Sequence, residues 1–216
     1  MMPAPVSDRG SARCGGSRQV CRYMQNDVGN GSQRGLTAER HYQAGQALHR
    51  QGRLGEAEQH FRAALRIDPD DQDVLHWLAS LFFRTGRAAE AVKTYERIIA
   101  IAPGNAAARN GLGQVLHSMG RSGDARTQFE QAIMLEPNDA DAHYSLGVIS
   151  AAQGRLEEAL EYYRKALALK PDHPAARTNL GSSLSTLGRH GEAISCFEQA
   201  LSLQPKFAPA HYNLAV

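Results

Sequence analysis

A proline recurs every 34 residues along most of this chain, and this fixed interval constrains the fold more than any other feature. The five prolines are Pro69, Pro103, Pro137, Pro171 and Pro205. Equal spacing indicates an internal repeat of one supersecondary unit that stacks against its neighbours. Helices of an ordinary bundle would share no such period.

Four further rows of residues keep the same interval. A small residue stands 24 positions before each proline, a glycine 17 before, an alanine 12 before and an aromatic residue 8 before. In the second unit these residues are Ala79, Gly86, Ala91 and Tyr95. Each row therefore marks one position of a repeated structure.

These rows predict two helices per unit. Leu78 and Phe82 lie one helical turn apart and mark the buried face of the first helix. Gly86 ends that helix, because glycine readily takes a positive φ, and the second helix then runs to the proline. We expect the alanine row to face the small residues of the first helix. The aromatic row should fill the space between successive units.

An arginine and an acid also recur three residues apart. The pairs are Arg53 and Glu56, Arg87 and Glu90, Arg121 and Asp124, Arg155 and Glu158, and Arg189 and Glu192. An acid in the first turn of a helix is stabilised by the helix dipole, typically by about 0.3–1 kcal/mol. This position favours a structural role for the pairs, and a ligand-binding arginine ladder is the alternative.

The period and its rows resemble the tetratricopeptide repeat family, whose unit is about 34 residues long. The fourth unit reads ADAHYSLGVISAAQGRLEEALEYYRKALALKPDH. The array is similar to those of bacterial tetratricopeptide repeat proteins and of O-GlcNAc transferase-like enzymes. The resemblance implies an all-α solenoid, a right-handed superhelix of antiparallel helix pairs. It also implies a concave groove, lined by the first helices, that binds a peptide or a partner protein.

Five repeats fill residues 37–207, and the chain divides into three parts around them. The repeats span 38–71, 72–105, 106–139, 140–173 and 174–207. Residues 1–36 hold five arginines and two aspartates among many Gly and Ser, so we expect a disordered basic leader. Residues 208–216 begin the first helix of a sixth, truncated repeat.

Composition excludes several classes of partner. Lys and Arg number 24 against 22 Asp and Glu, a net charge of +2, far from the basic balance typical of nucleic-acid-binding domains. No apolar run approaches the roughly 18 residues of a transmembrane helix. We therefore expect neither nucleic acid nor membrane as a partner. Three cysteines are too few for a disulfide framework, which favours a cytoplasmic location.

The sequence carries no signature of catalysis. It lacks the His-Glu-x-x-His zinc motif, the Gly-x-Ser-x-Gly nucleophile turn and the Gly-x-x-x-x-Gly-Lys phosphate loop. We expect no enzyme activity from this segment, no cofactor and no metal ion.

A second stripe on each first helix supplies the candidate binding residues. At about 100° per residue it lies more than a quarter-turn from the buried face, and the resemblance makes it the concave wall. The candidates, with their immediate neighbours, are Tyr42, Gln46, His49, His76, Trp77, Ser80, Phe83, Asn110, Gln114, His117, Tyr144, Asn179, Ser182, Tyr212 and Asn213. Their aromatic members either anchor a peptide or pack between neighbouring first helices, and the sequence leaves both roles open.

Two binding modes of the family apply differently to this stripe. Members that grip an acidic C-terminus place Lys, Asn and Arg here, whereas this chain has Tyr, His, Ser and Gln, so we expect no such clamp. Arrays attached to O-GlcNAc transferases hold a substrate backbone with a row of asparagines along this wall, an asparagine ladder. Asn179 and Asn213 stand 34 residues apart and resemble the start of such a ladder at the C-terminal end.

The pattern indicates a scaffold for protein interactions. The alternative is the N-terminal part of a larger transferase that recruits substrate or partner, such as an O-GlcNAc transferase-like glycosyltransferase, a sulfotransferase or a methyltransferase. Self-association through the uncapped C-terminal end is a further possibility.

Overall fold

The computed structural model describes residues 18–214 as α-helices joined by short turns, with no strand in this range. Residues 1–17 of the predicted leader and 215–216 of the predicted sixth repeat lie outside the described residues. The helices are α1 (Arg18–Arg50), α2 (Leu54–Ile67), α3 (Gln72–Arg84), α4 (Ala88–Ile101), α5 (Ala106–Ser118), α6 (Ser122–Leu135), α7 (Ala140–Ala152), α8 (Leu156–Leu169), α9 (Pro174–Thr186), α10 (His190–Leu203) and α11 (Ala208–Leu214).

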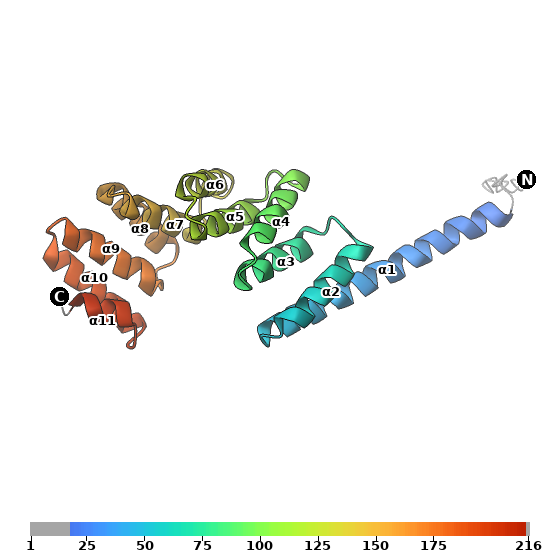
Figure 1. Ribbon diagram of the computed structural model, residues 1–216, viewed down its shortest axis with the longest axis horizontal. Helices are drawn as coiled ribbons and strands as arrows, with labels where there is room; N and C mark the ends of the chain where they lie inside the picture. The colour runs from blue at the N-terminus through green and yellow to red at the C-terminus, as the bar shows by residue number, and fades with distance from the viewer. Residues whose placement is uncertain (1–17, 215–216) are drawn as a thin grey trace, which may run out of the picture.

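The helices pack as consecutive pairs, α1 with α2 through α9 with α10, and each pair stacks on the next (Figure 1). The second helix of one pair contacts the first helix of the following pair. The chain is therefore an all-α solenoid of helix pairs, as the repeat predicts. α11 packs on α9 and α10 at the C-terminal end of the array.

The N-terminal region departs from the predicted disorder. α1 begins at Arg18, so residues 18–36 extend the first helix outward from the array (Figure 1). This stretch contains no proline, so nothing interrupts its backbone hydrogen bonds. The Thr37 hydroxyl donates to the Gln33 carbonyl at 2.8 Å and so bonds within the helix in place of capping a new one.

A glycine in the left-handed conformation lies in the turn between the two helices of each pair. The φ angles are 75–79° at Gly52, Gly86, Gly120, Gly154 and Gly188, and no described non-glycine residue has a positive φ. In the second unit, the Arg87 amide donates to the Phe82 carbonyl at 2.8 Å and the Gly86 amide to the Phe83 carbonyl at 3.1 Å. This is the Schellman arrangement, and it confirms the predicted role of the glycine row.

The core forms where the aromatic row meets the small residues of the first helices. An ideal Cβ placed on Gly113 would lie 2.8 Å from the ring of Phe129, which is 1% exposed. The same closeness recurs between Gly45 and Phe61, Gly147 and Tyr163, and Gly181 and Phe197. The ring is therefore the group nearest to the glycine, a contact that we expected from the alanine row.

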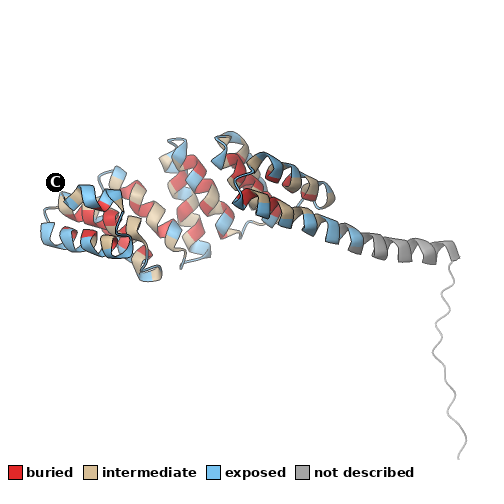
Figure 2. Ribbon diagram, turned by 90° about the horizontal axis from the view of Figure 1, so that it is seen from below, coloured by how far each residue is buried: buried red, intermediate tan, exposed pale blue. Residues whose placement is uncertain are grey.

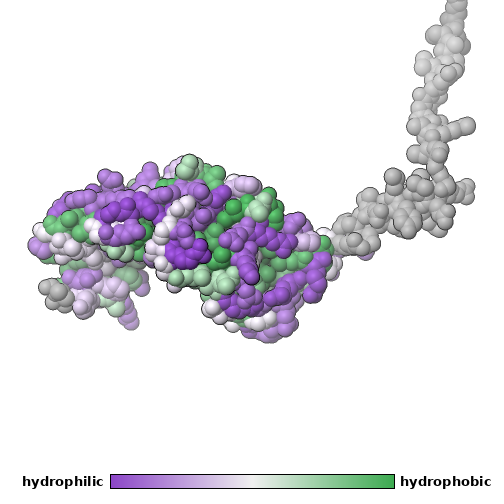
Figure 3. Space-filling view, turned by 45° about the horizontal axis from the view of Figure 1, so that its top comes forward, coloured by the Kyte–Doolittle hydropathy of each residue, from purple (hydrophilic) through white to green (hydrophobic). Residues whose placement is uncertain are grey.

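Buried residues run along the array where successive helices meet (Figure 2). On the side of the array shown in Figure 3, hydrophilic residues dominate and hydrophobic ones form smaller groups among them. The buried hydrophobic residues form two clusters, one from α2 to α7 and one from α8 to α10. Each cluster spans several helices, as expected when each unit hides the apolar flank of its neighbour.

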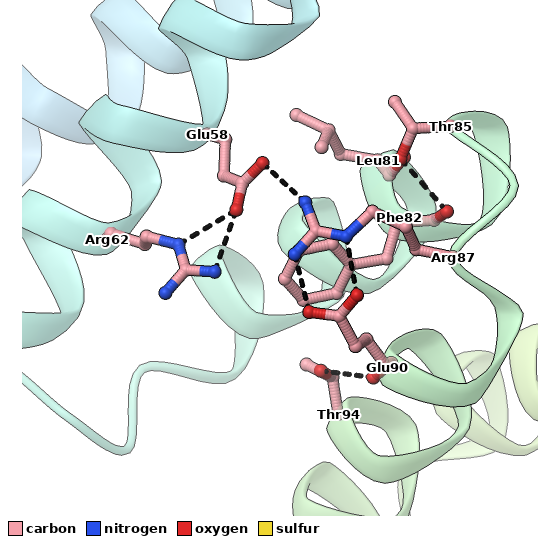
Figure 4. Close-up of polar contacts among 8 residues, drawn as sticks. All are labelled: Glu58, Arg62, Leu81, Phe82, Thr85, Arg87, Glu90 and Thr94. Atoms are coloured by element: carbon pink, nitrogen blue, oxygen red, sulfur yellow. Dashed lines mark hydrogen bonds and ion pairs between the residues drawn. The ribbon is translucent and has the colours of Figure 1, made fainter.

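All five arginine–acid pairs form. The arginine immediately precedes each second helix, the acid lies in its first turn, and the N···O distances are 2.5–3.2 Å. Arg87 also links two units, because its guanidinium donates to Glu58 of α2 at 2.8 Å and to Glu90 at 2.5 Å (Figure 4). It lies 4.3 Å above the ring of Phe82, a cation–π contact. These contacts support the structural role of the row.

Replacing Gly113 with Ala should lower the free energy of unfolding by about 1–3 kcal/mol, because the added Cβ must displace the ring of Phe129. Gly123→Ala is the matched control, since no atom lies within 4 Å of its Cβ position. In a helix this change should stabilise by about 0.5–1 kcal/mol. Urea denaturation measures both, and equal stabilisation by the two variants would contradict the glycine–ring contact.

The substitution Arg87→Met should shift the urea midpoint further than Arg53→Met. Among the described side chains Arg53 pairs only with Glu56 in its own unit, whereas Arg87 also joins Glu58 across the unit boundary. The difference between the two variants should shrink at high salt, because salt screens exposed ion pairs. Equal midpoints for the two variants would show that the bond between units adds nothing.

Candidate partner-binding site

The first helices of successive units form one continuous face. α1 contacts α3, and the contacts continue through α5, α7 and α9 to α11. We call the surface formed by these six helices the first-helix face. Every predicted binding residue lies on one of these helices.

Several predicted aromatic residues pack between units. Trp77 stacks on Phe61 with 6.3 Å between ring centroids and meets His49 edge-on at 5.1 Å. Phe83 and Tyr42 are half-buried against the same core. These rings therefore make packing contacts between units, one of the two roles that the sequence left open.

His49 is 9% exposed beneath Trp77. Arg84 Nη1 donates to its Nε2 at 2.8 Å. Burial, and then the charge of Arg84, lower the pKa of His49. The imidazole is therefore neutral at pH 7 and accepts the arginine hydrogen bond.

The predicted asparagines join neighbouring first helices. Asn179 Nδ2 donates to the Tyr144 hydroxyl at 3.1 Å, and Asn213 Nδ2 donates to Ser182 Oγ at 3.1 Å. The Tyr144 ring lies 4.7 Å from that of His173. Both side-chain amides therefore link neighbouring first helices. In an asparagine ladder these N–H groups would donate to the ligand, whereas here each amide donates to the protein itself.

The remaining candidates differ in exposure. Gln46 is half-buried on α1, and His117 Nδ1 lies 3.4 Å from Ser122 Oγ. Tyr212 is 72% exposed on α11. Ser182 and Asn213 border a hollow of about 460 Å³ between α9, α10 and α11, near the C-terminal end of the array.

A hollow of about 490 Å³ opens on the first-helix face over α5, bordered by α3 on one side and by the start of α7 on the other. Four predicted residues line it together: His76, Ser80, Asn110 and Gln114. The structure adds residues that sequence reasoning did not select, namely Tyr95, Ala107, Gly111, Glu136, Asn138, Asp139, Ala140 and Asp141.

Hydrogen bonds fix one wall of this hollow. Asn110 is 9% exposed, and its Nδ2 donates to Asp139 Oδ2 at 2.7 Å, while Gln114 Nε2 donates to Asn110 Oδ1 at 3.2 Å. Asp139 Oδ1 accepts the amides of Asp141 and Ala142 at 3.0 Å each and so caps α7. The wall is therefore set before any partner arrives.

Tyr95 of α4 forms the floor of the hollow. In the other four units the equivalent ring lies against a glycine of its own first helix, but here that position is Ala79. Tyr95 lies against Gly111 of the next unit, where an ideal Cβ would be 2.5 Å from the ring Cζ. The equivalent position holds Trp77 beside Phe61 in the preceding boundary, so at Gly111 the ring meets bare backbone in place of a side chain. His76 meets the ring edge-on at 5.4 Å. Because Ala79 carries a methyl group where the other units have a glycine in contact with the ring, we infer that the Tyr95 ring is displaced from its own first helix relative to the other rings.

Burial keeps both Tyr95 and His76 uncharged. It raises the pKa of Tyr95 to about 12 and lowers the pKa of His76. Both side chains are therefore neutral at pH 7, and any charge in the hollow comes from its carboxylates.

Sequence reasoning missed Tyr95 and the carboxylates because it considered the first helices alone. A signal for the floor was present: Ala79 interrupts a row of glycines, and Gly111 stands where the neighbouring units have Trp77 and Ser145. The two departures fall in adjacent units and compensate for each other.

Two other kinds of site are absent from the described residues 18–214. No three His, Cys, Asp or Glu side chains in this range are grouped so that they could hold a metal ion. None of its helices combines the length and the apolar character needed to cross a membrane.

The fold and the repeat define a tetratricopeptide repeat solenoid. Residues 34–216 match the family described as the cilia and flagella-associated protein 70 C-terminal domain, and the chain belongs to this family. No curated protein sequence matches the chain.

Solved structures confirm the tetratricopeptide repeat fold. MamA is 25% identical with a TM-score of 0.65, over 81% of this chain and 95% of that chain. PilF of Pseudomonas aeruginosa is 23% identical with a TM-score of 0.76, over 82% of this chain and 81% of that chain. YrrB, described as a TPR protein with an unusual peptide-binding site, is 21% identical with a TM-score of 0.63, over 82% and 91%. A scaffold for protein interactions is the general role that this fold supports.

The coupling of Ala79 and Gly111 through the Tyr95 ring can be tested by a double-mutant cycle. Gly111→Ala alone should destabilise by about 1–3 kcal/mol, because its Cβ meets Tyr95. Adding Ala79→Gly reopens the ordinary place for the ring, so the double variant should regain about 1 kcal/mol relative to the sum of the single changes. Urea unfolding of all four proteins gives the coupling, and additive effects would contradict the shift of the ring.

Proposed function

We propose that this chain is a non-catalytic scaffold that binds an extended segment or a helix of a partner protein on its first-helix face. The hollow between α3, α5 and α7 is the observation that carries the proposal. Its volume of about 490 Å³ falls among those of ligand sites, about 300–1,000 Å³. The peptide-binding site attributed to YrrB, which shares the fold, supports the same assignment.

The rigidity of this face favours binding. Asn110, Gln114 and Asp139 are already joined by hydrogen bonds, and Trp77 is already stacked in the core. A preformed surface loses little conformational entropy on binding, so more of the contact energy appears as affinity.

A blocking substitution tests the location. Twelve-residue peptides selected from a random displayed library on the wild-type protein should bind Gln114→Trp at least about tenfold more weakly, because the indole fills the hollow. Gln59→Trp, an equally exposed change on α2, should leave affinity unchanged. Fluorescence anisotropy measures both. Failure to select any peptide, or equal affinity for Gln114→Trp and wild type, would refute the proposal.

A further inference from the structure

The hydroxyl of Tyr95 is a polar group in the lining of the hollow. The residue is 4% exposed and lines the hollow, no described residue forms a hydrogen bond with its hydroxyl, and burial is the one cause acting on its pKa. An ideal Cβ on Gly111 would lie 2.7 Å from this oxygen. The glycine thus keeps the hydroxyl open to whatever enters the hollow. The hydroxyl oxygen is not among the fully buried atoms without a partner, so it is accessible from the hollow. A ligand that displaces water from this oxygen must replace the hydrogen bond that water makes there, which favours a ligand with a polar group at this point.

The charges around the hollow have one sign. Its lining includes Glu136, Asp139 and Asp141 and no lysine or arginine. Among the described residues, no cationic group lies within 4.0 Å of the first two carboxylates. Asp141 Oδ1 lies 4.0 Å from Lys170 Nζ and from His173 Nε2, at the limit of an ion pair. Because His76 is neutral, nothing in the lining balances these charges.

The Tyr95 hydroxyl and the surrounding carboxylates together favour a cationic ligand. An acidic segment would be repelled by the carboxylates, and an apolar side chain would leave the Tyr95 hydroxyl without a partner. An ammonium or guanidinium group supplies N–H donors for the hydroxyl and a positive charge for the carboxylates.

We propose that the hollow accepts a lysine or arginine side chain of the bound partner segment. The Tyr95 hydroxyl accepts a hydrogen bond from the cationic head, and Glu136 and Asp141 neutralise its charge. The small side chains of Ser80 and Ala107, which line the same hollow, leave room for the methylene stem. This inference rests on the proposed function and adds the specificity of the site.

The first test uses peptides selected from the random library on the wild-type protein. They should be enriched in Lys or Arg at one position, and norleucine there should lower affinity about tenfold, as expected for losing charge-assisted hydrogen bonds. Glu136→Gln combined with Asp141→Asn should weaken binding to the same extent and abolish the preference for a cation. Glu161→Gln combined with Glu198→Gln removes the same charge from exposed sites on α8 and α10 and should change little.

The second test isolates the hydroxyl. Tyr95→Phe should fold normally, because Phe61, Phe129 and Phe197 occupy the equivalent position in other units. It should lower affinity for the cationic peptide about three- to tenfold and leave the norleucine peptide unaffected. Tyr163→Phe, the matched change in the fourth unit, should have no effect on either peptide.

The outcomes separate this inference from the proposed function. Peptides that bind in a manner sensitive to Gln114→Trp but show no preference for Lys or Arg would overturn the cation site and leave the groove intact. Loss of affinity in Tyr95→Phe that is equal for both peptides would also overturn it, since the hydroxyl would then not contact the charge. Failure to select any peptide would overturn both.

Discussion

Close contact between an aromatic ring of each second helix and a glycine of a first helix is the constraint on which the rest of the structure depends. Helix axes can approach closely only where one of them lacks a side chain, and the ring then fills the space with buried apolar surface. The contact recurs every 34 residues, so stacking continues along the array. The left-handed glycines turn the chain between paired helices and keep the register.

The candidate site arises from the one unit in which this contact changes. Ala79 closes the ordinary place for the ring, and Gly111 opens another in the next unit. The ring that moves there is a tyrosine, which brings a hydroxyl to a surface edged by carboxylates. A small change in packing thus places a core residue in the lining of the hollow that we propose as the binding site.

Features of the fold that depend on local spacing could be predicted from the sequence. The paired helices, the turn at Gly86 and the pairing of Arg87 with Glu90 all follow from residues close together in the chain. The extension of α1 could not, because its glycines and serines carry the composition of a disordered segment. Among the residues that line the hollow, helical periodicity selects Asn110, whereas selecting Tyr95 requires knowing how far a ring reaches between helices.

The position of the Tyr95 ring is the most direct test of this account. Nuclear Overhauser effects between the Tyr95 ring protons and the α protons of Gly111 report it in solution, without a substitution or a ligand. The account predicts strong signals to Gly111, alongside signals from Phe129 to Gly113 of its own unit. Absence of the signals to Gly111 would contradict the shifted ring and with it the floor of the hollow.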